Sequence, residues 1–315
     1  MEERRLTKGN AIQQNTYRTQ GRINAVKNEL ERIRCAAKRD KELKFTTIMH
    51  HITIDRLRSA FLILKRNVAA GVDGETWATY DEHREENLKQ LHRNLHNGGY
   101  KAKSSRRVYI PKADGRLRPL GVAALEDKIL QRAVTEVLNA IYEVDFLGFS
   151  YGYRPKKNPH QALDALAVGI RWKKISWILD ADICGFYDNI NHDWMMKFIQ
   201  HRIADKRVQR LIKKWLNAGI IENNEWRPSE LGTPQGASLS PLLSNIYLHY
   251  ALDTWVEWWR KKHAKGDVII TRWADDFVVG FQHQGDARKF QIALNERLNK
   301  FSLSLNQTKT RLIRF

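Results

Sequence analysis

The sequence predicts an α+β fold, in which short antiparallel strands alternate irregularly with helices. Two stretches rich in β-branched and aromatic residues, 106–122 and 268–281, each carry turn residues near the middle and indicate β-hairpins. Elsewhere, apolar residues recur at helical spacing without the regular strand–helix–strand rhythm of a parallel sheet. Because hairpins imply antiparallel pairing, an α+β architecture is favoured.

The first segment, to about residue 48, is polar and basic. Within it, Ile23, Val26, Leu30 and Ile33 recur at helical spacing. A solvated helix with one packing stripe is favoured over a dedicated RNA-binding helix on this segment alone. The candidate nucleic-acid contacts on it are Lys27, Arg34, Lys38 and Arg39.

The elements that follow are marked by periodicity and by turn residues. Residues 59–77 predict a helix that closes in a glycine-containing loop, and 106–122 place Asp114 and Gly115, a pair favoured in type I′ turns, between two apolar runs. Helical spacing returns at 125–142 and at 208–216, where Gly219 provides a stop.

Two strands carry unexpected acids. In WILDADI, 177–183, the apolar residues at 177, 179, 181 and 183 share one face, whereas Asp180 and Asp182 share the other. Asp275 and Asp276 lie at the tip of the predicted 268–281 hairpin. A structural turn or pairing with Lys or Arg would explain either pair alone. Recurrence in two strands of a chain poor in acids favours bound cations instead.

The composition narrows the function. The 315 residues contain 54 Lys+Arg and 35 Asp+Glu, a net charge of +19, which indicates a polyanionic partner and most simply nucleic acid. No apolar run is long enough for a membrane span, and the N-terminus lacks the apolar stretch of a secretory signal. Cys35 and Cys184 suit neither a zinc site nor a disulfide framework. We expect a protein that is not secreted, with no membrane partner.

Converging carboxylates in a nucleic-acid-binding protein favour Mg²⁺, which prefers oxygen ligands and is commonly held by one or two carboxylates plus substrate phosphates. Two such ions can stabilise the attacking and leaving oxygens of a phosphoryl displacement. The acids are therefore expected to hold metal.

Seven stretches, in order, resemble the reverse transcriptases of bacterial group II introns, the intron-encoded maturase family. RNVAAGVDGETW and RVYIPKADGRLRPLGV resemble its fingers blocks, and the stretch from 127 to 163 resembles the block that leads into the palm. The palm motifs A, B, C and D are matched by DADICGFYDNINH, GTPQGASLSPLLSNIYL, RWADDFVV and LSLNQTKTRL.

The resemblance implies an RNA-directed DNA polymerase with a right-hand fold of fingers and palm, the palm being an antiparallel sheet with packed helices. It assigns two Mg²⁺ ions, for which Mn²⁺ can substitute, to Asp182, Ile183, Asp275 and Asp276, and leaves Asp180 as a supporting acid. The implied partners are RNA (intron RNA or template), a DNA primer and dNTPs. The implied location is the bacterial cytoplasm or an organelle.

Other residues receive roles from the same resemblance. Tyr187 matches the aromatic residue that excludes a ribose 2′-hydroxyl, Phe186 beside it is expected to pack in the core, and Lys309 is a candidate proton donor to pyrophosphate. The remaining contacts implied for the nucleotide are Lys112, Arg118, Ile183 and Gln235. Additional nucleic-acid contacts are expected at Arg106, Arg107 and Trp273, although general phosphate attraction also accounts for the arginines. Ser240 before Pro241 is expected to cap the helix that follows motif B.

Two features depart from the family pattern. Motif C begins with Trp273 where the family usually has Tyr, which keeps the ring and loses the hydroxyl. The chain ends at Phe315, just past motif D, so we expect a thumbless core: residues 1–48 a basic helical extension, 49–165 the fingers with part of the palm entry, and 166–315 the palm. Apolar surface left where a thumb would dock is an expected site of self-association.

Two alternatives stay open on the sequence. One is an RNA-binding maturase fragment that recognises intron RNA for splicing through its basic surface, with the polymerase pocket incidental. The other is a relative adapted to a different task, such as a retron, a diversity-generating element or a CRISPR-associated reverse transcriptase.

Overall fold

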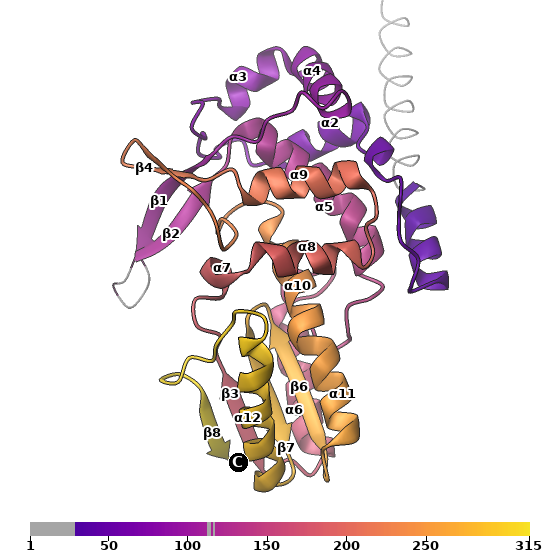
Figure 1. Ribbon diagram of the computed structural model, residues 1–315, viewed down its shortest axis with the longest axis vertical. Coiled ribbons are helices and arrows are strands. Elements are labelled where there is room, and N and C mark those ends of the chain that lie inside the picture. Colours follow the sequence, from indigo (N-terminus) through magenta and orange to yellow (C-terminus); the bar gives the residue numbers. More distant parts are fainter. Residues whose placement is uncertain (1–28, 112–114, 116) are drawn as a thin grey trace, which may run out of the picture.

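Two four-stranded sheets, set apart along the long axis of the molecule, organise the fold (Figure 1). The computed structural model describes residues 29–111, 115 and 117–315. The strand order is β2-β1-β4-β5 in the first sheet and β6-β7-β3-β8 in the second. Helices combined with largely antiparallel sheets confirm the predicted α+β class.

The first sheet is built on the predicted hairpin, formed by β1 (Ser105–Pro111) and β2 (Leu117–Val122) in antiparallel register. Pro111 pairs with Leu117, so residues 112–116 connect the strands; Lys112 and Asp114 lie outside the described residues. β4 (Ile220–Glu222) adds to β1 in parallel, and β5 (Glu225–Arg227) returns beside it. The hairpin pattern could not predict this parallel pair, because it joins segments far apart in the sequence.

The second sheet is antiparallel throughout its paired strands. In β3 (Trp177–Ala181), Leu179 and Ala181 are buried while Asp180 is exposed, which confirms the predicted alternation. β7 (Asp276–Phe281) and β8 (Arg311–Arg314) flank β3, and β6 (Val268–Trp273) forms the edge beyond β7. This register places the end of β3 beside the turn between β6 and β7.

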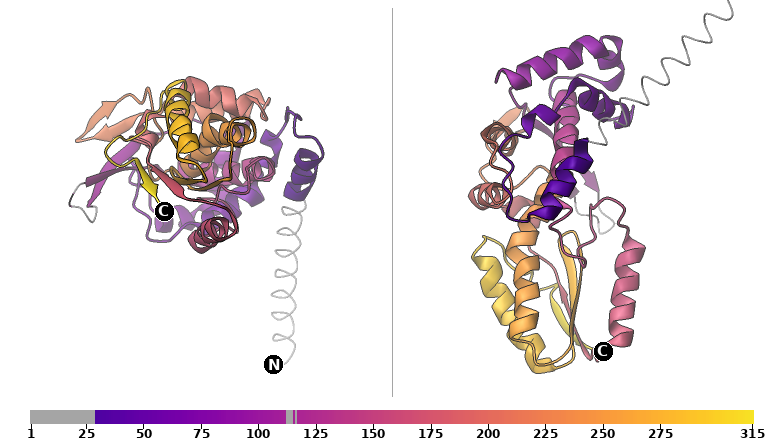
Figure 2. Two further views of the ribbon diagram at one scale, coloured as in Figure 1. Left: turned by 90° about the horizontal axis from the view of Figure 1, so that it is seen from below. Right: turned by 90° about the vertical axis from the view of Figure 1, so that its right-hand side faces the viewer.

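Helices cover both faces of the second sheet (Figure 2). α11 (Thr254–Lys262) and α12 (Gln284–Asn299) lie on one face. α6 (Pro159–Trp172) packs against β6 on the other face and crosses the predicted boundary at residue 165. Because β4 and β5 belong to the first sheet, that sheet combines strands from both sides of residue 165, whereas all four strands of the second sheet lie after it.

The core between the sheets is largely helical. α5 (Leu125–Tyr142) has the predicted bounds and contributes Ile129, Leu130 and Ile141 to one hydrophobic cluster that reaches the second sheet. The predicted helix at 208–216 is confirmed by α9 (Lys206–Leu216), and Gly219 follows it at φ 76°. The other helices between the two sheets are α8 (His192–Gln200), α10 (Ser240–Leu248) and the π-helix η2 (His249–Asp253).

The prediction for 59–77, a helix that closes in a glycine-containing loop, is confirmed. α2 (Ile54–Ile63) ends where the backbone turns to an extended conformation at Leu64. The loop that follows contains Gly71 and Gly74, and it leads into α3 (Trp77–Glu82) and α4 (Arg84–His96). Thr76 caps α3 by accepting a hydrogen bond from the Thr79 amide, a local signal that favours a new helix start.

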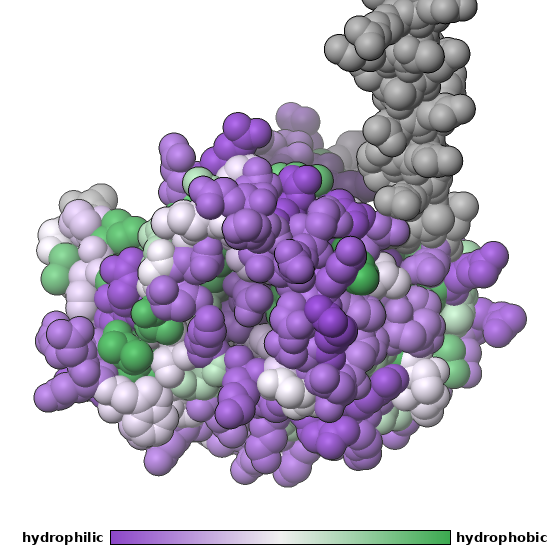
Figure 3. All heavy atoms as spheres, turned by 90° about the horizontal axis from the view of Figure 1, so that it is seen from above, coloured by the Kyte–Doolittle hydropathy of each residue, from purple (hydrophilic) through white to green (hydrophobic). Residues whose placement is uncertain are grey.

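The described part of the basic N-terminal segment has the expected packing stripe. Residues 29–39 are helical, with Ile33 and Ala37 buried against the core. Their basic side chains, Arg34, Lys38 and Arg39, are exposed, whereas Lys27 lies outside the described residues. Figure 3 shows the end of the molecule near α2 and α4 as a mostly hydrophilic surface. Among the residues described, no helix is both long and apolar enough to cross a membrane.

Candidate active site

The turn between β6 and β7 presents the first acid of the site. Trp273 pairs with Asp276, which leaves Ala274 and Asp275 as a two-residue turn and confirms the predicted hairpin. Ala274 adopts φ 58°, a left-handed conformation that suits such tight turns. Asp276 is thus the first residue of β7 and not part of the turn itself. The side chain of Asp275 is half-buried and that of Asp276 is exposed.

The pairing of β3 with β7 brings Asp182 to the same place. Ala181 is opposite Phe277, so the residue after Ala181 lies next to Asp276 at the end of the pair. The backbone of Asp182 holds this end in place, since its carbonyl accepts a hydrogen bond from Asn306 N at 2.8 Å. Three of the sequence-predicted acids, Asp182, Asp275 and Asp276, therefore meet at one edge of the second sheet.

The carboxylates influence one another electrostatically. Burial raises the pKa of the Asp275 carboxyl, and the negative charge of Asp182 raises it further, while Arg118 lowers it. Partial desolvation likewise raises the pKa of Asp276, with added repulsion from Asp275 and Asp182, although its side chain reaches solvent. Both shifts disfavour the ionised forms, as expected where like charges converge without enough positive charge.

Lys309 supplies positive charge directly to Asp182. Its Nζ lies 3.2 Å from both carboxylate oxygens of Asp182, and its charge lowers the pKa of Asp276. The lysine comes from the loop before β8, which is anchored where Cys184 N donates to the Ser304 carbonyl at 2.9 Å. Because the Lys309 side chain is 54% exposed, it can leave this position without breaking the core.

The acids fit a cation that the substrate helps to bind. Within residues 29–111, 115 and 117–315, no three His, Cys, Asp or Glu side chains form a group that could hold a metal ion. However, Mg²⁺ is commonly bound through one or two carboxylates and completed by substrate phosphates, not by a cage made of protein alone. Two or three mutually repelling carboxylates suit that mode of binding. Ile183, whose side chain is buried, could contribute only its backbone carbonyl.

Tyr187 lies beside these acids on the short helix α7 (Phe186–Asn189). It is half-buried, and its hydroxyl is 3.5 Å from Ser244 Oγ of α10. Burial raises the pKa of Tyr187, and the charge of Asp275 adds to that shift. Phe186 is buried in the core, as predicted. The ring of Tyr187 is therefore held at the border between the core and the acidic edge.

The loop at 232–239 connects α7 to the first sheet near the site. Thr233 N donates to the Tyr187 carbonyl at 2.9 Å, and Gly121 N of β2 donates to the Gln235 carbonyl at 2.7 Å. Gln235 is half-buried. The prediction that Ser240 caps α10 was wrong: its hydroxyl bonds Thr233 Oγ1 at 2.6 Å and the Pro234 carbonyl at 2.9 Å, so it fastens the loop to the helix.

Replacing Gly232 by Ala should lower the free energy of unfolding by about 2 kcal/mol. Gly232 has φ +81°, and a Cβ there would lie 2.7 Å from the Tyr187 carbonyl oxygen. Urea unfolding followed by circular dichroism would measure the change. Gly285→Ala is the matched control, since nothing lies within 4 Å of its Cβ and it stands in α12. A Gly232→Ala protein as stable as this control would contradict the close approach.

The predicted basic contacts are distributed over two regions. Arg118 is exposed on β2, and its charge reaches Asp275. Arg106 donates to the Ala70 carbonyl at 2.8 Å, so it also fixes a loop, and Arg107 is half-buried. Trp273 pairs with Asp276 at the site. The helix 29–39 with Arg34, Lys38 and Arg39 lies on the opposite side of the molecule from the β1–β2 hairpin (Figure 1).

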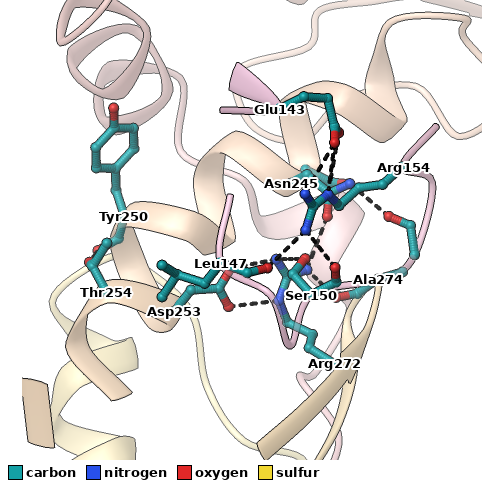
Figure 4. Close-up of polar contacts among 12 residues, drawn as sticks. Glu143, Leu147, Ser150, Arg154, Asn245, Tyr250, Asp253, Thr254, Arg272 and Ala274 are labelled. Atoms are coloured by element: carbon teal, nitrogen blue, oxygen red, sulfur yellow. Dashed lines mark hydrogen bonds and ion pairs between the residues drawn. The ribbon is translucent and has the colours of Figure 1, made fainter. Parts of the chain in front are cut away.

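Sequence patterns did not single out Arg272, the residue before Trp273. It is fully buried and forms an ion pair with Asp253, which is also fully buried, at 2.6 Å (Figure 4). The available signal was a charged residue on the apolar face of the predicted strand 268–273. Its partners could not be found from the sequence, because they come from distant segments.

Comparison with known proteins adds independent information. Residues 110–314 match the family described as reverse transcriptase (RNA-dependent DNA polymerase). Protein YkfC of Escherichia coli (strain K12) is 33% identical over 273 residues, which cover 76% of this chain and 71% of YkfC. The group II intron-encoded protein LtrA of Lactococcus lactis subsp. cremoris is 36% identical over 222 residues, 70% of this chain and 37% of LtrA.

A more distant match is the putative COX1/OXI3 intron 1 protein of Saccharomyces cerevisiae, which is 28% identical over 305 residues. Those residues are 82% of this chain and 36% of the yeast protein. The chain thus spans most of the length of YkfC but little more than a third of the two named intron proteins.

Proposed function

Because this chain belongs to the reverse transcriptase family, among the group II intron-encoded proteins and maturases, we propose that it is an RNA-directed DNA polymerase core. It would add dNTPs to a DNA primer along an RNA template. The meeting of Asp182, Asp275 and Asp276 at one sheet edge, with Arg118 within electrostatic reach, is the observation that carries this proposal.

In this proposal, the second sheet with its helices is the palm, and the first sheet with α2 to α4 forms the fingers. The division of the sequence into 1–48, 49–165 and 166–315 belongs to the same proposal, with the addition that β4 and β5 complete the fingers sheet. The acids would then lie on the palm, facing the β1–β2 hairpin. Arg118 and Lys112, which flank Asp114 and Gly115 in the sequence, would hold the incoming triphosphate.

The proposed reaction is an in-line displacement at phosphorus. The primer 3′ oxygen forms a bond to the α-phosphorus of the dNTP and loses its proton, while the bond from that phosphorus to pyrophosphate breaks. Two magnesium ions, or manganese ions in their place, would stabilise the attacking and leaving oxygens. Asp182, Asp275 and Asp276, with the Ile183 carbonyl, would hold those ions and orient the reacting groups.

The basic residues and the motif B loop would complete the site. Arg118 would neutralise charge that develops on the leaving phosphates. Lys309, once displaced from Asp182, would stand near the same phosphates as a proton donor to pyrophosphate. Tyr187 would lie against the sugar and Gln235 near the new base pair, a placement supported by their shared loop contacts. Trp273 would contact the primer end.

Primer extension tests the proposal. We expect a labelled DNA primer annealed to RNA to be extended by this chain with dNTPs and MgCl₂, and to remain unextended with EDTA. The Asp275→Ala variant should give no product, whereas Asp164→Ala, which changes an exposed acid on α6, should extend like the parent chain. No extension by the parent chain under any of several salt and metal conditions would contradict a working polymerase core.

A second function, RNA binding as a maturase, is favoured by the net charge of +19 and by the exposed Arg34, Lys38 and Arg39. Binding through phosphates should weaken steeply as salt rises. If the Asp275→Ala variant binds RNA as tightly as the parent chain while extending no primer, the two functions use separable surfaces. RNA binding too weak to measure at low salt would rule out the maturase role for these residues.

A further inference from the structure

We propose that Arg272, held by Asp253, is a positioning residue that fixes the turn carrying Asp275. The expected effect of Arg272 on catalysis rests on the proposed polymerase function. The immobilisation of the turn itself can be tested without any enzymatic activity.

Arg272 uses all of its hydrogen-bonding capacity inside the protein (Figure 4). An arginine side chain has five N–H donors. Nε and Nη2 bond the two carboxylate oxygens of Asp253 at 2.7 and 2.6 Å, and Nη2 also reaches Ser150 Oγ at 2.6 Å. Nη1 donates to Asn245 Oδ1 at 3.0 Å and to the Ala274 carbonyl at 2.8 Å. A planar guanidinium with fully occupied donors allows one orientation only.

The bond to Ala274 connects this pair to the proposed site. Ala274 is the first residue of the two-residue turn, and Asp275 is the second. Arg272 therefore holds the peptide that leads directly into Asp275. The backbone of Ala274 has a left-handed conformation, which a non-glycine residue adopts at some cost, so an external restraint on this peptide has a physical reason.

The segment 149–152 restrains the turn a second time, through the backbone of Arg272. Tyr151 N donates to the Arg272 carbonyl, and Arg272 N donates to the Phe149 carbonyl, each at 2.9 Å. Gly152 follows this segment, and a Cβ on it would lie 2.2 Å from Ala274 N, so only glycine fits there. Asn245 Nδ2 donates to the Gly152 carbonyl at 2.8 Å, which links the segment to the same arginine network.

Arg154 in turn stiffens the segment that supports Arg272 (Figure 4). Its Nη1 donates to the carbonyls of Leu147 and Ser150 at 2.8 and 2.7 Å, and its Nη2 lies 3.1 Å from Glu143 of the turn after α5. Ser150, whose hydroxyl accepts from Arg272, is thereby fixed through its own backbone. The restraint on the Asp275 turn thus extends to the helical core.

The π-helix η2 brings two partners of Arg272 to the same side. α10, η2 and α11 follow without interruption, and Asn245 and Asp253 stand eight residues apart, since 253 − 245 = 8. In an ideal α-helix that separation would rotate the two side chains by about 80° relative to each other. The wider π turn reduces this offset, and such turns occur often at functional sites.

A contribution to fold stability does not by itself explain why the protein has the buried ion pair of Arg272 and Asp253. Replacing a buried ion pair by apolar residues of similar size is often neutral or stabilising. The double variant Arg272→Met, Asp253→Leu should therefore fold, yet it lacks the bond to the Ala274 carbonyl. It separates positioning from stability more cleanly than a single substitution, which would leave a buried charge unpaired.

The chain offers a matched control in Arg202, which is also almost completely buried. Its Nε lies 3.0 Å from Asp145, and its Nη2 donates to the Ala37 carbonyl at 3.2 Å. It fastens residues 37–45 next to the α8–α9 connection, and none of its bonded partners belongs to the acidic edge. Arg202→Lys should perturb a buried arginine network without touching the Asp275 turn.

The experiment compares the parent chain with Arg272→Lys, the double variant and Arg202→Lys. Amide hydrogen exchange should show faster exchange at residues 271–277 in the two Arg272 variants and unchanged exchange there in Arg202→Lys. In primer extension, kcat should fall by about 10- to 100-fold in the Arg272 variants, with a higher Mg²⁺ requirement and an unchanged KM for primer–template. Thermal unfolding of all four proteins reports stability separately.

Parent-like exchange and extension in a stably folded double variant would overturn the proposal. Losses of activity that simply follow the thermal midpoint, Arg202→Lys included, would also overturn it, because the role would then be structural. If the parent chain itself extends no primer, the polymerase proposal fails, but the exchange at 271–277 still decides whether Arg272 immobilises the turn.

Discussion

Replacing Asp275 by Asn should reduce primer extension by about 10³-fold or more and leave the protein folded. The amide has nearly the same size as the carboxylate but lacks the charge that would hold and orient the metal-bound phosphates. Losses of this size are typical when a preorganised electrostatic contact to the reacting groups is removed. Single-turnover extension with saturating primer–template and dNTP would measure the change in the chemical step.

The same substitution should not destabilise the protein. Burial and the charge of Asp182 raise the pKa of Asp275 in the folded protein, which means that ionised Asp275 costs stability at neutral pH. The neutral amide removes that cost. We therefore expect the thermal midpoint of Asp275→Asn, measured in EDTA, to equal or exceed that of the parent chain, as is common for residues kept for function at the expense of stability.

Asp180→Asn is the matched control for Asp275→Asn. Asp180 lies on the same face as Asp182, pairs with Val278 and is exposed, and its charge contributes to the raised pKa of Asp276. Because Asp180 is only a supporting acid, Asp180→Asn should reduce primer extension by less than about 10-fold. Equal losses for the two variants would contradict the assignment of Asp182, Asp275 and Asp276 as the metal-binding set.

The sequence predicted those parts of the fold that depend on local periodicity. The alternation in 177–183 placed Asp180 and Asp182 on one face, and the β-branched runs around 274–275 defined the hairpin. The bounds of α5 were evident because a buried amphipathic helix repeats its apolar residues over several turns. In each case the spacing of apolar residues in the sequence follows directly from the repeat of the strand or the helix.

The parts that could not be predicted depend on which distant segments meet. Asp253 as the partner of Arg272, Lys309 as the partner of Asp182 and the parallel pairing of Ser105 with Ile220 leave no periodic signal. The resemblance to a family located the acids, whereas the structure located what supports them.

Replacing Tyr187 by Ala should lower the preference for dNTPs over NTPs by about 100-fold, the size expected when a pocket loses its steric block against one small group. In the proposed site the Tyr187 ring lies beneath C2′ of the sugar and collides with a ribose hydroxyl. The ring is held there by its half-buried position and by the bond from Thr233 N to its own carbonyl. Extension measured separately with each dNTP and its matching NTP gives the ratio of kcat/KM values.

Tyr187→Phe separates the ring from the hydroxyl. The phenolic oxygen lies 3.5 Å from Ser244 Oγ, a long contact whose loss should affect stability little, while the phenyl ring still fills the space beneath the sugar. We therefore expect Tyr187→Phe to keep the dNTP preference of the parent chain. If both variants accept NTPs equally well, the selection depends on the hydroxyl and not on steric exclusion; if neither does, the sugar is selected by another residue and Tyr187 serves the core that it borders.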